Sequence, residues 1–213
     1  MVITYYGLAC LKVQSGETVL AFDPPSKESE FKSPRFQTDI VFVSHNHKDH
    51  NGFENLAAKT EGKVFLLIDG PGEYETSGIH ITGIKSFHDS SSGQKYGLNT
   101  IYKVEIEDII ICHIGDFGEK NLRPDLKENI GEIDILFIPI GGETVLEPGD
   151  ASRIVSQIGP KIVIPIHYKK GNALKKFLEE VGNGESKPLE KLSIKKKDLT
   201  DNKTKVAVLE PCL

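Results

Sequence analysis

Cysteine is scarce in this 213-residue sequence, and the three cysteines that occur are far apart. Cys10, Cys112 and Cys212 are odd in number and lack the spacing of a disulfide framework or a cysteine metal site. We expect each of them to be a small buried or terminal residue. Chains without a disulfide framework are typical of reducing compartments, so we expect a cytoplasmic location.

Long apolar runs are also absent. No segment approaches the ~18 consecutive apolar residues that a membrane-spanning helix requires. A strand-like apolar pattern begins at Val2, which leaves no room for the charged start and cleavage site of a secretory signal. We therefore expect neither membrane insertion nor export.

An excess of positive charge is the third missing feature. The formal net charge is −5, whereas proteins that hold a phosphate backbone usually carry a basic face. The lysine-rich stretch 187–206 is interspersed with acids, and we interpret it as the solvated face of a strand or hairpin. Nucleic acid is therefore not the expected partner, and a small-molecule substrate fits better. The sequence carries no signal of oligomeric state.

Linkers, low-complexity segments and short-period repeats are missing too, so we predict a single domain over residues 1–213. The first three strands should form an antiparallel meander. Strands are expected at residues 2–6, 9–13, 18–22, 38–44, 63–68, 79–87, 100–116 (a hairpin turning near Glu107 and Asp108), 133–142, 161–168, 191–196 and 205–211. Helices are expected at 51–62, 147–159 and 172–182, with a turn-rich segment at 69–78 and a polar loop at 90–99. This alternation predicts an α/β (α+β) protein, a four-layer αββα sandwich of two mixed sheets with helices outside.

The most informative stretch is "HNHKDH", residues 45–50, which places three of the seven histidines and an aspartate within six positions. His45 and His47 are two apart, so an extended or tightly turned backbone directs both imidazoles into one hollow. Asp49 and His50 lie beyond a turn and reach a second point. Imidazoles and a carboxylate suit Zn²⁺ or a similar borderline ion. A histidine-rich surface loop or a helix cap would account for Asp49 but not for three imidazoles so close together. We therefore predict a metal site.

Further candidate ligands follow other strand-like segments. His88 and His167 each come directly after an apolar run. In "CHIGDFG" we favour Asp116 as a ligand, because a carboxylate bridges two ions, and His113 as a supporting or packed residue. Sites gather at such strand ends because the sheet is rigid while the loops vary.

The combined motifs resemble a known family. "HNHKDH", the histidine of "FHDSSS", the aspartate of "GDFG" and the histidine of "IPIHY" occur in the order of the metallo-β-lactamase superfamily, over essentially the whole chain. "AFDP" near the start and "PIGG" before "IPIHY" look more narrowly like the branch of predicted Zn-dependent hydrolases that includes L-ascorbate-6-phosphate lactonase. The resemblance implies the αββα sandwich, with its site at one edge between the sheets.

The resemblance also implies roles for individual residues. One metal ion would be held by His45, His47 and His88 and a second by Asp49, His50 and His167, with Asp116 bridging the two. Asp23 in "AFDP" would be a buried aspartate that supports the site, or else part of a turn before two prolines. The implied cofactors are two divalent ions, with Zn²⁺ favoured and Mn²⁺, Fe²⁺ or Ni²⁺ compatible with the same ligands.

Such a site supports hydrolysis without a serine or cysteine nucleophile. Two ions about 3.5–4 Å apart share a bridging water and lower its pKa, so that hydroxide attacks at pH 7. The catalytic carboxylates would be Asp116, between the ions, and Asp49, which can hold the proton of the hydroxide. Tyr168 is a candidate oxyanion donor or a packing residue. Lys48 faces substrate or water, and the loop 141–144 is a pocket wall or a plain connection.

We therefore predict a metal-dependent hydrolase that cleaves a small ester, lactone or phosphodiester. An RNA or DNA phosphodiesterase is the alternative within the same superfamily, because its RNA-processing members share the ligand set, and the negative net charge argues against it. A non-catalytic metal-binding scaffold is the alternative from another class. All seven ligand positions are filled, which argues against the scaffold.

The replacement His47→Ala should remove bound metal and hydrolytic activity together, because the imidazole is a predicted ligand. Metal content by inductively coupled plasma mass spectrometry and turnover of the same preparation check this. A variant that kept full metal content and full turnover would contradict the assignment of His47.

Overall fold

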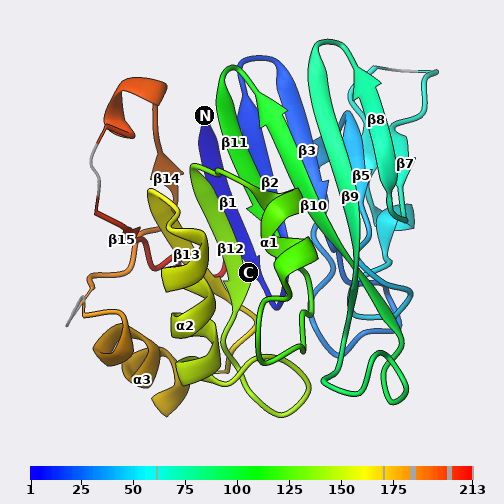
Figure 1. Cartoon of the computed structure of the whole chain (residues 1–213). Helices are drawn as coiled ribbons and strands as arrows, with labels where there is room; N and C mark the ends of the chain where they lie inside the picture. The colour runs from blue at the N-terminus through cyan, green and yellow to red at the C-terminus, as the bar shows by residue number, and fades with distance from the viewer. Residues whose placement is uncertain (61, 170, 183–185, 201–202, 213) are drawn as a thin grey trace.

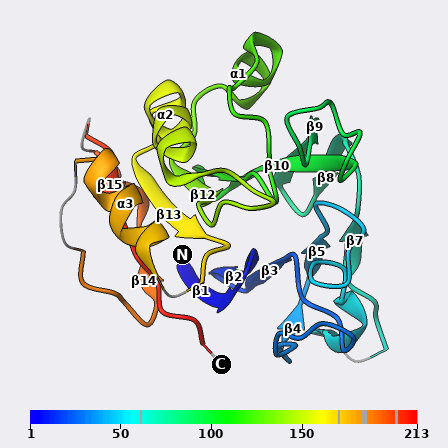
Figure 2. The same ribbon diagram turned by 90° about the horizontal axis from the view of Figure 1, so that it is seen from below.

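Two β-sheets packed face to face dominate the computed structural model, which describes residues 1–60, 62–169, 171–182, 186–200 and 203–212 (Figure 1). Seen along the sheets, the helices lie over the outer face of one sheet, and the other sheet lies on the far side (Figure 2). The predicted sandwich of two mixed sheets is confirmed. Among the described residues, no helix combines the length and the apolar character needed to cross a membrane.

The first sheet begins with the predicted antiparallel meander. It contains, in spatial order, β14 (Leu192–Ser193), β1 (Val2–Gly7), β2 (Cys10–Ser15), β3 (Thr18–Phe22), β5 (Ile40–Phe42) and β7 (Leu66–Ile68). β1, β2 and β3 pair antiparallel, whereas β3, β5 and β7 run parallel. The carboxyl ends of β3 and β5 therefore meet at the same edge of the sheet.

The second sheet is antiparallel on one side and parallel on the other. It contains, in spatial order, β15 (Lys205–Val206), β13 (Ile162–Ile166), β12 (Ile135–Pro139), β11 (Ile109–His113), β10 (Leu98–Ile106), β9 (Ile79–Phe87) and β8 (Gly72–Thr76). β11, β12 and β13 are parallel, so their carboxyl ends also meet at one edge. The predicted hairpin between β10 and β11 turns at Glu107 and Asp108, both with positive φ, as in turns that match the twist of paired strands.

Unbroken apolar sequence explains why β12 and β13 lie in the middle of the molecule. All five positions of each strand are buried, as expected for a strand covered on both faces. Phe137 packs in the core between the two sheets, while its neighbours Leu136 and Ile138 pack in the layer beneath the helices. Alternating residues of one strand thus serve two hydrophobic layers.

The helical layer covers one sheet only. α2 (Pro148–Ile158) and α3 (Asn172–Glu180) match predicted helices, and they pack with α1 (Pro124–Ile130) over the second sheet. The sequence did not predict α1, because its seven residues contribute only two buried side chains, Leu126 and Ile130. That number is too small to establish a helical period.

The predicted helix at 51–62 is wrong. The described part of this segment holds a 3-10 turn, Phe53–Asn55, followed by β6 (Ala57–Ala58), which pairs with β4 (Gln37–Thr38); residue 61 lies outside the described residues. Leu56 is extended and packs against the outer face of the first sheet, and the backbone N–H of Ala57 donates to Phe36 O. Tertiary packing and this pairing take the hydrogen bonds that a helix would have used. The outer face of the first sheet is therefore covered by this short segment.

Two further differences concern strands. The predicted strand 63–68 is limited to β7, and the predicted turn-rich segment 69–78 contains β8. Glu73 and Glu75 of β8 face solvent at the sheet edge, where charged side chains are common. These acidic residues are the reason why the sequence did not predict β8 as a strand. The two predicted closing strands, β14 and β15, form in different sheets and are two residues long.

Tyr102 links the two sheets close to the ends of β5 and β7. Its buried hydroxyl, on β10, donates to Val43 O at 2.8 Å and lies 3.1 Å from Ile68 O. Burial raises the pKa of Tyr102, so the phenol stays protonated and can donate. This bond fixes the start of the loop that carries the histidine cluster.

The replacement Tyr102→Phe should lower the free energy of unfolding by about 1–3 kcal/mol, because it removes the buried hydroxyl that donates to Val43 O. Urea unfolding of the metal-free protein measures this change without a contribution from metal binding. Tyr74→Phe is a matched control, since the hydroxyl of Tyr74 donates to Gly70 O from a half-buried position. An equal effect of the two replacements would contradict the linking role of Tyr102.

Candidate metal centre

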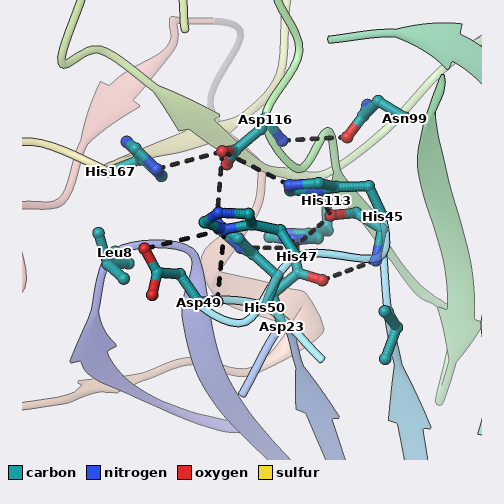
Figure 3. Close-up of polar contacts among 12 residues, drawn as sticks. Leu8, Asp23, His45, His47, Asp49, His50, Asn99, His113, Asp116 and His167 are labelled. Atoms are coloured by element: carbon teal, nitrogen blue, oxygen red, sulfur yellow. Dashed lines mark hydrogen bonds and ion pairs between the residues drawn. The ribbon is translucent and has the colours of Figure 1, made fainter. Parts of the chain in front are cut away.

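The candidate ligands lie in loops that follow strands at one edge of the sandwich. The cluster 45–50 follows β5, His88 follows β9, Asp116 follows β11 after two residues, and His167 follows β13. Because these strand ends meet at one edge, residues more than 100 positions apart come together (Figure 3). The expectation that the candidates gather at strand ends agrees with this arrangement.

Asp116 lies at the middle of the cluster. Its Oδ2 atom is 3.2 Å from His167 Nε2, 3.3 Å from both His50 Nε2 and His88 Nε2, and 4.0 Å from His45 Nε2. Figure 3 shows Asp116 with His167 on one side and His45 and His50 on the other. One carboxylate oxygen thus faces four imidazoles from three loops.

His47 and Asp49 lie further out. The side chain of His47 is 53% exposed, and its Nδ1 is 3.8 Å from Asp49 Oδ2. His47 still falls within ligand distance of His45 and His50, whereas Asp49 does not join a group of three. Six of the seven predicted ligands therefore take part in the possible metal-binding groups of the described residues, and Asp49 lies beside them.

The polar atoms of the cluster are incompletely satisfied. Six buried side-chain atoms of the described residues lack a hydrogen-bond partner, and five of them lie here: Asp49 Oδ1, His50 Nδ1, His88 Nδ1, His113 Nδ1 and Asp116 Oδ1. Buried polar groups are normally paired, because each unpaired one costs stability. Two orphaned carboxylate oxygens among imidazoles form a donor set that suits a divalent ion of the Zn²⁺ type. The residues therefore fit a metal site.

A second layer of buried polar groups supports the cluster from below. Asp23 is fully buried, and its Oδ2 lies 2.8 Å from His113 Nε2 and 3.8 Å from His50 Nδ1. The same carboxylate accepts bonds from the backbone N–H and the hydroxyl of Ser44, each at 2.7 Å. The Ser44 oxygen in turn lies 3.0 Å from His45 Nδ1. Asp23 thus connects two imidazoles of the cluster to the core.

Charges in this environment set the protonation states. Burial and the neighbouring His50 lower the pKa of His45 to about 3, so its imidazole is neutral. Burial alone would lower the pKa of His50, but the carboxylates of Asp116 and Asp23 raise it to about 10. Burial alone would raise the pKa of Asp116, yet His167 and His50 hold it well below its usual range. Asp116 is therefore ionised at any physiological pH.

Close backbone approaches place Asp116 and His88. A Cβ on Gly115 would lie 2.5 Å from Asn99 Oδ1, and one on Gly118 would lie 2.3 Å from His88 O. Glycine is therefore required at both positions, and Gly115 also has a φ of +56°. The backbone of "GDFG" thus lies directly against Asn99 and His88.

His167 is held in a strained conformation by the turn between β1 and β2. Its φ is +51°, a left-handed value that is uncommon for a residue with a side chain. The His167 N–H donates to Leu8 O at 2.6 Å, and the Tyr5 hydroxyl donates to the same carbonyl at 2.9 Å. The meander therefore fixes the orientation of a candidate ligand from the other sheet.

The sequence did not reveal several residues that position the centre. Asn99 accepts the Asp116 N–H, and Asp89 accepts four backbone N–H groups of the loop that follows His88. Ser44 and Tyr5 act as described above. Ser44 directly precedes the histidine cluster and Asp89 directly follows His88, and these adjacencies were the available signals. Asn99 and Tyr5 depend on contacts between segments distant in sequence.

The remaining predicted site residues lie around the cluster. Lys48 is exposed, and its carbonyl accepts the Ser26 N–H. The ring of Tyr168 packs against the hydrophobic layer beneath the helices. Tyr168 and the loop 141–144 also line a cavity that borders His167. A Cβ on Gly141 would lie 2.2 Å from His167 O, so this loop packs directly on the ligand segment.

Comparison with known proteins agrees with this geometry. Residues 2–167, which include all the candidate ligands, match the family described as the beta-lactamase superfamily domain. A UPF0173 metal-dependent hydrolase of Lysinibacillus sphaericus (strain C3-41) is 32% identical over 200 residues, which cover 79% of this chain and 85% of the relative. A UPF0173 metal-dependent hydrolase of Thermococcus onnurineus (strain NA1) is 27% identical over 190 residues, covering 78% and 84%.

A solved structure is similar over the full length. The crystal structure of a predicted Zn-dependent hydrolase of the metallo-β-lactamase superfamily from Thermotoga maritima has a TM-score of 0.77 at 28% identity, with 98% of this chain and 99% of that chain covered. None of these three proteins is described as an L-ascorbate-6-phosphate lactonase, so that narrower part of the resemblance is not shown.

Metal binding should release protons and strengthen as the pH rises. His50 holds a proton in the metal-free protein up to a pKa of about 10, and an imidazolium cannot act as a ligand. Zinc binding at pH 7.5 should therefore release about one proton from this residue. Isothermal titration calorimetry in two buffers of different ionisation enthalpy measures the number.

The control for this prediction is Asp23→Asn. It removes one of the two carboxylates that raise the pKa of His50 and should reduce the number of protons released. Zinc binding without proton release, at an affinity independent of pH, would contradict the protonation state of His50.

Proposed function

Because the chain belongs to the metallo-β-lactamase superfamily and, within it, to the UPF0173 metal-dependent hydrolases, we propose that it uses two divalent ions, preferably Zn²⁺, to cleave a small ester, lactone or phosphodiester. One ion would be held by His45, His47 and His88 and the other by Asp49, His50 and His167, with Asp116 between them. Mn²⁺, Fe²⁺ or Ni²⁺ would suit the same ligands.

The observation that carries this proposal is the set of four imidazoles around Asp116 Oδ2. A carboxylate oxygen has two lone pairs, so four imidazoles are more than its hydrogen bonds can use. The buried oxygens Asp49 Oδ1 and Asp116 Oδ1 have no partner. Divalent ions account for both features, since they take imidazole nitrogen and carboxylate oxygen as ligands.

When bound, a pair of divalent ions would supply a bridging hydroxide at neutral pH and polarise the scissile carbonyl or phosphoryl oxygen. The residues of the chain do the remaining work. Asp116 stays ionised and keeps the imidazoles directed inward. Asp23 and Ser44 orient His50 and His45 from below, as partners of ligands commonly do. Asp49 would hold the proton taken from water and pass it to the leaving group.

The position of the lysine-rich stretch favours a small substrate over RNA. Ser193 of β14 pairs with Val2, at the end of β1 away from the Gly7–Leu8 turn that contacts His167. The lysines that follow Ser193 therefore lie at the opposite end of the sandwich from the candidate centre. A protein that grips RNA needs cations beside the site of cleavage, and the lysines that follow Ser193 supply none there.

We further propose that residues 1–213 form one domain of a cytoplasmic enzyme. The core between the sheets draws on residues from Ile3 to Leu209, which supports a single unit. The three cysteines are free, with Cys10 and Cys112 buried, which supports a reducing compartment.

Protein purified without chelator or added metal should contain about two equivalents of zinc, manganese or iron by inductively coupled plasma mass spectrometry. Asp116→Asn should lose metal and lower kcat/KM by at least ~100-fold, because the bridging charge disappears. Lactones, carboxylic esters, phosphodiesters and RNA are the substrates to compare.

Asp108→Asn is the matched control, since Asp108 is exposed in the turn between β10 and β11. Metal near zero that is not recovered on adding zinc or manganese would overturn the proposal. Two bound ions with no turnover of any substrate would favour the scaffold, and cleavage of RNA alone would favour the nuclease.

A further inference from the structure

A cavity of about 470 Å³ adjoins the candidate centre, and His167 forms part of its wall. Its walls come from five regions of the chain: the β1–β2 turn, residues 31–32, the loop 141–144, the segment that contains His167 and leads into α3, and Pro211 near the C-terminus. Cavities of this size hold small to medium organic ligands. Any group that enters it lies next to a predicted ligand of the second ion.

The walls of this cavity are largely apolar. Tyr6, Leu8, Phe31, Tyr168, Ala173 and Pro211 all line it. Phe31 is 40% exposed and therefore keeps accessible apolar surface beside the cavity. The charged residues of the described lining, Lys32, Glu143 and Lys169, are all exposed and therefore lie at the rim. Among the described lining residues, therefore, none offers a buried charged side chain to a substrate.

A second hollow beside the centre has a different character. His47 lines a second hollow, with Lys27, Asn46, Lys48 and Asn51 among its neighbours. These side chains are polar and almost all exposed. The centre thus adjoins both an apolar cavity at His167 and a polar, open hollow at His47.

We propose that the cavity at His167 is the specificity pocket of the enzyme, and that it takes the uncharged apolar acyl group of an ester or lactone. The polar alcohol part then faces the hollow at His47; in an ester it leaves to solvent, and in a lactone it stays attached to the acyl group as the new hydroxyl. This inference rests on the proposed hydrolytic function and narrows its substrate class. The apolar group is desolvated in the pocket, whereas a charged acyl group would lose its hydration without gaining a partner.

A series of esters with one alcohol group and acyl chains from acetyl to hexanoyl tests the pocket. Each methylene that enters it should raise kcat/KM about fourfold, which corresponds to ~0.8 kcal/mol per buried CH₂. Ala173→Phe fills the cavity from α3 and should lower kcat/KM for the hexanoyl ester at least tenfold while leaving the acetyl ester within about twofold. Phe31→Ala removes an exposed wall and should weaken the chain-length preference without a cost to folding.

Ala57→Phe is the matched control, because Ala57 is exposed on β6 and does not line the cavity. Saturation-transfer NMR measures the binding of 1-hexanol to the metal-free protein and provides a readout that is independent of turnover. Ala173→Phe should reduce this binding and Ala57→Phe should leave it unchanged.

The two proposals fail in different ways. If esters of all chain lengths are hydrolysed at equal rates, or if Ala173→Phe leaves the chain-length selectivity unchanged, the assignment of the cavity as a specificity pocket is wrong. The proposed hydrolytic function is not affected by that result. In the other case, 1-hexanol binds and Ala173→Phe abolishes this binding, but the metal-loaded protein cleaves no ester or lactone. That result would support the pocket and overturn the proposed ester or lactone hydrolysis.

Discussion

The convergence of imidazoles on the carboxylate of Asp116 is the interaction on which the rest of the structure depends. Four Nε2 atoms lie within 4.0 Å of one oxygen, although their residues are spread from position 45 to position 167. Such a cluster is costly to bury unless its charges are compensated. The fold meets this constraint by bringing the carboxyl ends of parallel strands in two sheets to a single edge.

The buried polar groups beneath the cluster connect it to the core by hydrogen bonds and ion pairs. Asp23 connects His113, Ser44 and His50, so a buried carboxylate of one sheet is bonded to a histidine of the other. Tyr102 adds a second link between the sheets beside the same loop. These bonds make the geometry of the centre and the packing of the two sheets interdependent, which explains why polar groups are tolerated at such depth.

The surroundings of the centre bear on what it can act upon. Members of one fold share ligand sets while their substrates differ, because specificity lies in the walls around the ligands. Here the walls differ on the two sides: aromatic and aliphatic groups border His167, and polar side chains border His47. That asymmetry favours a substrate with one apolar and one polar part, oriented so that only the polar part returns easily to water.

Local sequence determined most of the strands, two of the three α-helices of the described residues and the candidate ligands, because these depend on apolar runs and on spacing within a few residues. For that reason the sequence was enough to predict the cluster 45–50 and the strand-ending positions of His88, Asp116 and His167. Tertiary structure alone decided the rest. It converted the expected helix at 51–62 into a 3-10 turn and a strand, and it recruited Tyr5 and Asn99 to hold His167 and Asp116. It also formed the cavity at His167 from five distant segments. Hydrogen bonds and packing between segments far apart in the chain leave no periodic trace in the sequence, so only the folded structure reveals them.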